Sequence, residues 1–168
     1  MALLKSIETG ATEPFGIVDA HAYKQHNLGA EDGVEGFTKL LQALPRGSAK
    51  VHTVRVFEDG EYVVAHSDYD FFGPKAGFDI FRFQHGRIVE RWDNLQEQPS
   101  TPNPSGHTML DGSTAVTDLE KADENKRLVC SFFDEVTVGD RVAASPRSTP
   151  GPSRRVATRV YALAERPS

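Results

Sequence analysis

The sequence has few of the features that mark secreted or membrane-spanning proteins. Its single cysteine, Cys130, cannot form an internal disulfide, so nothing in the chain requires an oxidising compartment. No run of about 18 apolar residues occurs, and the first residues lack the long apolar core of a signal peptide. We therefore expect a cytoplasmic protein that has no membrane partner.

Short motifs for phosphate binding and for serine nucleophiles are also missing. The segment from Gly29 to Gly36 contains acids and has neither P-loop nor dinucleotide-binding spacing. The sequence Ser105-Gly106-His107 lacks the context of a nucleophile elbow. We accordingly expect no cofactor.

The formal charge of −5 is unevenly distributed along the 168 residues. Residues 141–168 hold six arginines against one acid, which gives that segment +5 and leaves −10 for residues 1–140. An acidic domain repels phosphate backbones, and the basic segment is short and poor in aromatic residues. We expect no nucleic-acid partner.

The spacing of apolar residues changes once along the chain, from helical to strand periodicity. Helical spacing predicts a short helix at residues 3–10, a second short helix or turn at residues 15–20, and an amphipathic helix at residues 34–44. From Lys50 the period is two, which predicts four strands at residues 51–57, 62–71, 78–83 and 87–95. Helices grouped before an antiparallel meander predict an α+β fold.

The last third of the sequence differs in composition from the meander. Residues 99–112 are rich in Pro, Asn, Ser and Gly and predict an irregular segment, after which Asp118 can cap a helix over residues 119–135. The composition of residues 141–168 disfavours a core. We expect a domain at 1–112, a helical extension at 113–140, and a tail rich in Arg, Pro, Ser and Ala at 141–168.

The segment from Phe78 to Gln96 places carboxylates, arginines and a tryptophan among apolar residues. Its motifs Asp-Ile-Phe-Arg-Phe, Gly-Arg-Ile-Val-Glu and Trp-Asp closely resemble the closing hairpin of the SnoaL-like, polyketide cyclase-like branch of the nuclear-transport-factor-2-like (NTF2-like) superfamily. Residues 23–27 and 33–37 are similar to a second signature of this branch. The resemblance covers roughly residues 3–110. It implies an NTF2-like, cystatin-like cone in which N-terminal helices pack on a curved antiparallel sheet, with a pocket at the mouth.

Asp79 is the first candidate for chemistry. A carboxylate on an apolar strand face is desolvated, which raises its pKa and lets it exchange protons near neutrality. The alternative is that Asp79 lies at a strand end and only hydrogen-bonds a backbone amide. In the polyketide-cyclase members an aspartate opening this strand motif is the acid/base residue, and Asp79 matches it.

His66 and Asp68 share one face of the second predicted strand. We expect this face to bring His66 close to Asp79, which would give two titratable groups for moving a proton between carbon and oxygen. A metal site formed by His66, Asp68 and His26 is the competing interpretation. The chain has no second clustered pair and no cysteine ligand set, so we expect no metal.

Asp93 is a further catalytic candidate at the end of the last strand. In the epoxide-hydrolase relatives an aspartate near this position works with an Asp and an Arg on a neighbouring strand. Asp93 and Asp68 resemble the two acids. The arginine would be expected two residues before Asp68, but that position is occupied by His66. That departure weakens the hydrolase interpretation.

The remaining candidates would bind substrate. The resemblance places His26 and Asn27 at the pocket mouth, although a plain loop with an Asx-turn explains them equally well. Tyr23 and Tyr69 could donate hydrogen bonds to a carbonyl oxygen. Phe81 and Trp92 would contribute apolar surface, and for Trp92 a place in the core or in a dimer interface is the stronger alternative.

These features favour a small cofactor-independent enzyme that acts on an apolar, carbonyl-bearing molecule by isomerisation, aldol-type cyclisation or dehydration. A non-catalytic ligand-binding or dimerisation module is the alternative. We expect a homodimer formed through the outer sheet face, because apolar residues on both faces of a sheet need two covers. The two expected apolar sets are Phe78, Ile80, Ile88 and Trp92 on one face and Phe81, Phe83 and Val89 on the other.

Overall fold

The computed structural model describes residues 2–45 and 47–138. The chain divides into two compact units, Met1–Thr114 and Ala115–Ser168. The expected tail at 141–168 lies outside the described residues. None of the helices in the described part of the chain combines the length and the apolar character needed to cross a bilayer.

The first unit begins with the helices that the sequence predicts. Helix α1 spans Ala2–Thr9, the 3-10 helix η1 spans Glu13–Ile17, and helix α2 spans Gly33–Ala43. Helix α1 ends because Gly10 adopts a φ of +71° and its N–H donates to the carbonyl of Ser6 at 2.7 Å. Helix α2 begins at Asp32, whose carboxylate accepts the N–H of Gly33 at 3.0 Å.

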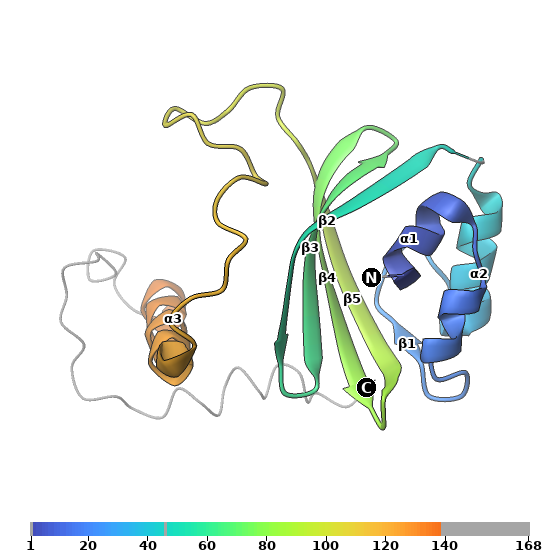
Figure 1. The fold of residues 1–168 in the computed structure, drawn as a ribbon, viewed down its shortest axis with the longest axis horizontal. Helices are drawn as coiled ribbons and strands as arrows, with labels where there is room; N and C mark the ends of the chain where they lie inside the picture. Colours follow the sequence, from blue (N-terminus) through green and yellow to red (C-terminus); the bar gives the residue numbers. More distant parts are fainter. Residues whose placement is uncertain (1, 46, 139–168) are drawn as a thin grey trace. The chain divides into compact units, whose positions relative to one another are not determined.

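The strands then form the expected antiparallel meander: β2 (Ala49–Asp59), β3 (Tyr62–Phe71), β4 (Pro74–Gln84) and β5 (Arg87–Glu97). A fifth strand, β1 (Lys24–Gln25), pairs with β5 in parallel, so the sheet order is β1-β5-β4-β3-β2 (Figure 1). The sequence did not predict β1, because two residues are too short to show a period of two.

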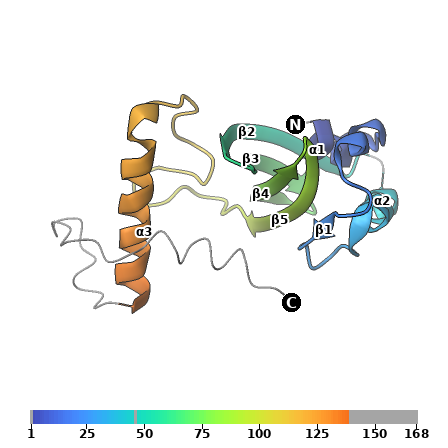
Figure 2. The same cartoon turned by 90° about the horizontal axis from the view of Figure 1, so that it is seen from below.

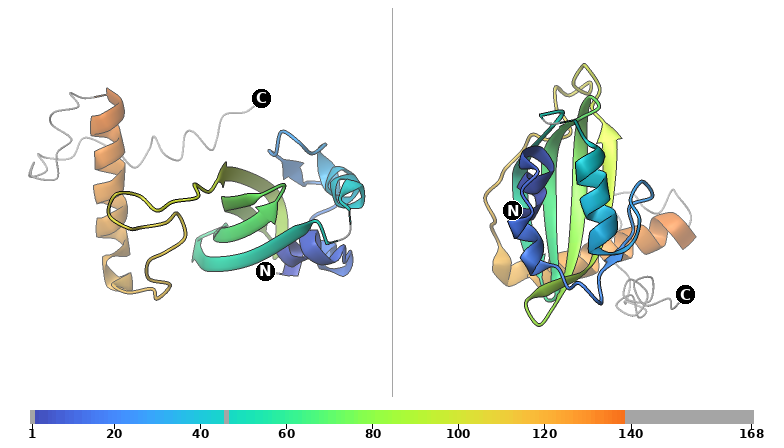
Figure 3. Two further views of the ribbon diagram at one scale, coloured as in Figure 1. Left: turned by 90° about the horizontal axis from the view of Figure 1, so that it is seen from above. Right: turned by 90° about the vertical axis from the view of Figure 1, so that its right-hand side faces the viewer.

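Helices α1 and α2 lie across one face of the sheet (Figure 3, right), and the sheet curves around them (Figure 2). We call this the inner face and the opposite one the outer face. The core between the helices and the inner face includes Leu3, Leu4, Phe15, Phe37, Val51, Ala65, Phe81 and Ile88. The expected α+β class, with N-terminal helices on a curved antiparallel sheet, is confirmed.

Strand register decides which side chains reach the core. Asp79 pairs with Ala65 on one side and with Asp93 on the other, so these positions belong to the inner face. His66 pairs with Phe78 and stacks on its ring at 4.3 Å between centroids, which places both on the outer face. Alternation along each strand extends this assignment to its neighbours.

Two register shifts interrupt the alternation. One lies between Arg82 and Phe83 in the β4 and β5 pairing, where Phe83 pairs with Ile88 and Arg82 with Glu90, so that Val89 is extra. Ile88 therefore enters the core, and its expected place beside Phe78 on the outer face is wrong. The other shift lies in β2 between Thr53 and Arg55.

The described part of the second unit consists of η2 (Leu119–Lys121) and helix α3 (Ala122–Val138). The sequence predicted that the side chain of Asp118 caps this helix, and this prediction is wrong. Asp118 adopts a left-handed φ of 55°, and its side chain makes no cap hydrogen bond. Its carbonyl instead accepts the N–H of Lys121 at 2.8 Å. Helix α3 carries an exposed apolar stripe, which consists of Leu128, Val129, Phe132, Phe133 and Val136.

Candidate functional site

A small cavity of about 130 Å³ lies between the helices and the inner face of the sheet. Its wall is mainly apolar and includes Ile7, Phe37, Leu40, Leu41, Leu44, Phe71 and Leu95. Four polar side chains also line it: Asn27, Tyr69, Arg91 and Asp93. A cavity of about 150 Å³ is enough to hold benzene, so this space suits a ligand with one six-membered ring.

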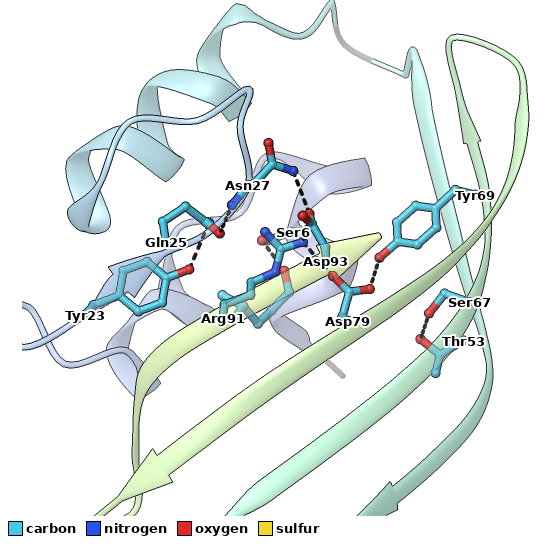
Figure 4. A network of polar contacts seen from close by, with 11 residues as sticks. Ser6, Tyr23, Gln25, Asn27, Thr53, Ser67, Tyr69, Asp79, Arg91 and Asp93 are labelled. Carbon is cyan, nitrogen blue, oxygen red and sulfur yellow. Dashed lines mark hydrogen bonds and ion pairs between the residues drawn. The ribbon is translucent and has the colours of Figure 1, made fainter. Parts of the chain in front are cut away.

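Arg91 joins two carboxylates at the polar end of the cavity. Its Nη2 lies 2.6 Å from Oδ1 of Asp79 and 2.9 Å from Oδ2 of Asp93 (Figure 4). The guanidinium carbon also lies 5.4 Å from the ring centre of Phe37 and 5.9 Å from that of Phe81. With 4% of its surface exposed, Arg91 is held by ion pairs and aromatic faces together.

Besides Arg91, each carboxylate accepts a hydrogen bond from one neutral side chain. The hydroxyl of Tyr69 donates to Oδ2 of Asp79 at 2.5 Å, and the side-chain amide of Asn27 donates to Oδ2 of Asp93 at 2.7 Å. Asp79 is only 1% exposed and does not line the cavity, whereas Asp93 does. Contact between a ligand and Asp79 therefore runs through Tyr69 or Arg91.

The electrostatics of this cluster favour a proton on Asp79. Burial raises the pKa of Asp79 above its ordinary value, and neither the guanidinium of Arg91 nor the hydroxyl of Tyr69 fully offsets this. Burial opposes the charge of Arg91, but Asp79 and Asp93 outweigh it and raise the guanidinium pKa. One cation shared by two buried carboxylates is neutral overall when one carboxyl is protonated.

The two tyrosines near the cluster keep their protons at neutral pH. Burial raises the pKa of Tyr23 to about 12, with the charge of Arg91 opposing that shift. Burial and the neighbouring Asp79 raise the pKa of Tyr69 as well. Tyr69 lines the cavity and can act there as a hydrogen-bond donor, while the Tyr23 hydroxyl accepts from Nε2 of Gln25 at 3.0 Å.

The inner face brings together six of the residues predicted from the sequence: Tyr23, Asn27, Tyr69, Asp79, Phe81 and Asp93. Of these, Asn27, Tyr69 and Asp93 line the cavity. Phe81 and Tyr23 belong to the core around Arg91. The set is a spatial cluster, and its role in catalysis remains a proposal.

His66 and Asp68 are not part of this cluster, so the predicted approach of His66 to Asp79 is wrong. Asp79 pairs with Ala65, and the next residue, His66, points to the outer face. There its Nδ1 lies 3.0 Å from Nη1 of Arg55, and burial together with that charge lowers the imidazole pKa. Asp68 accepts a hydrogen bond from Gln98 at 2.8 Å.

His26 and Trp92 also lie on the outer side of β5, away from the cavity, and their contact with substrate stays a prediction. Their rings stack at 4.8 Å between centroids and 4° between planes. Neither side chain lines the cavity. Trp92 directly follows Arg91, so the alternation along β5 turns it away from the inner face.

Arg91 is the site residue that the sequence analysis missed. A signal was available, because Arg91 stands two residues before Asp93 and must share its face. The resemblance to epoxide hydrolases points instead to the position two residues before Asp68, which His66 occupies. The second acid is Asp79, which the β4 and β5 register places opposite Asp93.

A metal centre does not form from the side chains of residues 2–45 and 47–138. No three His, Cys, Asp or Glu side chains among them lie together in a way that could hold an ion. The competing interpretation of His66, Asp68 and His26 as ligands therefore finds no matching cluster there.

Comparison with protein-family models gave no match, and neither did comparison with curated proteins. Several solved structures are similar. An NTF2-like protein of unknown function from Burkholderia xenovorans is 18% identical, with 58% of this chain and 80% of that chain covered and a TM-score of 0.46. TsrD from Streptomyces laurentii is 17% identical, with 55% and 81% covered and a TM-score of 0.45.

A protein with a ketosteroid isomerase-like fold from Catenulispora acidiphila is 17% identical, with 54% of this chain and 78% of that chain covered and a TM-score of 0.42. Of these three structures, the one from Burkholderia xenovorans is named as an NTF2-like protein. Their identities and TM-scores are too low to transfer the function of any of them.

Proposed function

We propose that this protein is a proton-transfer enzyme for small apolar carbonyl compounds with about one six-membered ring. The observation that carries the proposal is the Asp79–Arg91–Asp93 cluster at the polar end of an apolar cavity. Apolar walls suit a hydrocarbon ring, and the polar end supplies both a proton acceptor and a proton donor. The product is the isomer, or the aldol or dehydration product, that forms through an enol.

The roles follow from which groups reach the cavity. The carboxylate of Asp93, paired with Arg91, accepts a proton from the carbon next to the carbonyl. The electron pair of that C–H bond forms the C=C bond of the enol, and the carbonyl oxygen takes a proton from the hydroxyl of Tyr69. For this step the Tyr69 hydroxyl turns its hydrogen from Asp79 to the substrate, and protonated Asp79 passes its own proton to the oxygen of Tyr69 across their 2.5 Å contact.

Arg91 makes this arrangement feasible in a dry site. It neutralises one carboxylate at the start, and the proton moves from Asp79 to Asp93 by way of the substrate without changing the net charge of the cluster. A buried cluster of constant charge avoids the large cost of creating an uncompensated ion. Arg91 is thus a charge-balancing residue in the proposed reaction.

Hydrogen–deuterium exchange tests the proposal with cyclohexanone as the probe. In D₂O the protein should speed the loss of the protons next to the carbonyl, followed by proton NMR. Asp93→Asn should abolish the effect, because an amide cannot accept the proton. Asp68→Asn, which alters a carboxylate on the outer face, should leave it unchanged. Exchange that persists in Asp93→Asn would refute the proposed base.

Hydrolysis of a strained cyclic ether is a second candidate. The specific observation in its favour is that Arg91 bridges Asp93 and Asp79, whereas the sequence analysis found no arginine in a suitable position. Asp93 would take a proton from water, the water oxygen would attack carbon, and the breaking C–O bond would leave its electrons on the oxygen that Tyr69 protonates.

The probe for hydrolysis is 1-methylcyclohexene oxide, and the readout is formation of its diol. Diol formation without ketone exchange would favour hydrolysis over enolisation. Binding of both probes, seen as line broadening, with neither reaction would favour the non-catalytic binding module.

A further inference from the structure

The dipeptide His26-Asn27 crosses the edge of β5, so that its two side chains lie on opposite sides of that strand. The amide of Asn27 reaches Asp93 in the cavity at 2.7 Å. The ring of His26 stacks on Trp92, which points to the outer face. Between them, the backbone N–H of His26 donates to the carbonyl of Arg91 at 3.0 Å.

The imidazole of His26 is held on the outer side by a chain of polar contacts through Glu90 to Arg82. Its Nε2 lies 2.8 Å from Oε1 of Glu90, and Oε2 of Glu90 accepts from Nε of Arg82 at 2.8 Å. Burial raises the pKa of Glu90, but the hydrogen bonds from His26 and Arg82 outweigh it and lower the pKa overall. Trp92, Glu90 and Arg82 together form what we call the outer clamp of His26.

The other attachments of the segment that carries Asn27 are short and local. The N–H of Asn27 donates to Oε1 of Gln25 at 3.2 Å, and its carbonyl accepts the N–H of Ala30 at 3.2 Å. Strand β1 is two residues long, and Leu28, directly after Asn27, is 104% exposed. The N–H of Gln25 donates to the carboxylate of Asp32, and the N–H of Gly29 to the side-chain oxygen of Asn27 itself. On the outer side of β5, the outer clamp holds the side chain of His26, the residue directly before Asn27.

We propose that His26 is a positioning residue that fixes the amide of Asn27 on Asp93 from the opposite side of the strand. Its importance for turnover rests on the proposed function, because there Asp93 is the base that Asn27 orients. The effect of His26 on the position of Asn27 does not depend on the proposed function, and it can be measured without any substrate.

The first test is the side-chain amide signal of Asn27 in ¹⁵N NMR spectra of the full chain. In His26→Ala this signal should shift toward that of a solvent-exposed amide, because the clamp is lost. His26→Phe keeps the ring stack and loses the hydrogen bond to Glu90, so it should produce a smaller shift. The matched control is His52→Ala, an exposed histidine on β2, which should produce none.

An unchanged Asn27 signal in His26→Ala would overturn the proposal. If His26→Ala does not fold, His26→Phe and Glu90→Gln provide the readout, since each weakens one attachment. An unchanged Asn27 signal in both of these variants would overturn it equally.

The second test is kinetic and uses the cyclohexanone exchange assay. His26→Ala should lower kcat by about tenfold or more with KM changed by less than about twofold, as misplacement of a catalytic group predicts. His26→Gln can still donate to Glu90 and should recover part of the rate. If the wild-type protein does not exchange cyclohexanone, the proposed function fails, while the NMR result still decides the role of His26.

Discussion

Asp79 and Asp93 stand directly opposite each other on β4 and β5, and both contact the same nitrogen of Arg91. Like charges at opposed positions of neighbouring strands destabilise a sheet. The pair can persist because one guanidinium serves both carboxylates and because burial raises the pKa of Asp79, which eases its neutralisation. In the proposed reaction, Asp79 is the source of the proton that Tyr69 passes on.

Asp79→Asn should fold, since an amide imitates the protonated carboxyl. A raised pKa in the folded state means that Asp79 contributes stability below its ordinary value of 3.8 and loses that contribution as pH rises through the folded value. The free energy of unfolding of the wild type, relative to Asp79→Asn, should therefore fall with rising pH. Urea titrations between about pH 4 and about pH 8 measure this difference, and a rise would contradict the raised pKa.

Arg91→Met should destabilise the protein strongly. It leaves Asp79 and Asp93 in a buried position without their shared cation, which costs about 3–5 kcal/mol for a broken buried pair. Arg82→Met is the matched control, because Arg82 pairs with Glu90 on the outer face and its side chain is 22% exposed. Its cost should be nearer 1 kcal/mol, as for a more accessible pair. Equal losses in urea titrations would argue against a special role for Arg91.

Tyr69→Phe should raise the pKa of Asp79 further, because the hydroxyl of Tyr69 lowers it in the wild type. It should also slow the exchange of cyclohexanone by about 100-fold, a typical cost of removing one donor to a developing oxyanion. Carboxyl ¹³C titration and the exchange assay measure the two effects. Tyr23→Phe is the control, since Tyr23 is buried nearby but does not line the cavity.

The protein should form a homodimer through the outer face of the sheet. Phe57 and Phe78 are each 46% exposed, and helices α1 and α2 of the same unit cover the inner face. Phe57→Glu should weaken the dimer, whereas Gln42→Glu, at an exposed position on helix α2 over the inner face, should not. Light scattering at concentrations of tens of micromolar measures this, and a wild-type monomer would contradict it.

Local sequence patterns were sufficient to predict the order of helices and strands. The helix over α2 followed from its apolar spacing, and the hairpin turn at His85 and Gly86 has the positive φ values that two-residue turns favour. Strand β1 was not predicted, because it has only two residues and pairs with β5, which lies far along the sequence. Such pairing leaves no local pattern.

The site was harder to predict because it depends on register between strands. Placing His66 near Asp79 required β3 to be offset by one residue from its actual pairing, and an offset of one moves every side chain to the other face. Ile88 was misplaced for a similar reason, since the extra residue Val89 cannot be seen in the sequence of β5 alone. Arg91 could have been found by comparing it with Asp93 on the same strand.

The register shift in β2 has a consequence for aggregation. Strand β2 forms one edge of the sheet, and a long regular edge offers unpaired backbone groups to which other chains can add. Between Thr53 and Arg55 that regularity is broken, and Arg55 binds the carbonyls of Asp111, Gly112 and Ser113. The edge formed by β2 therefore does not provide one long, regular template for fibril growth.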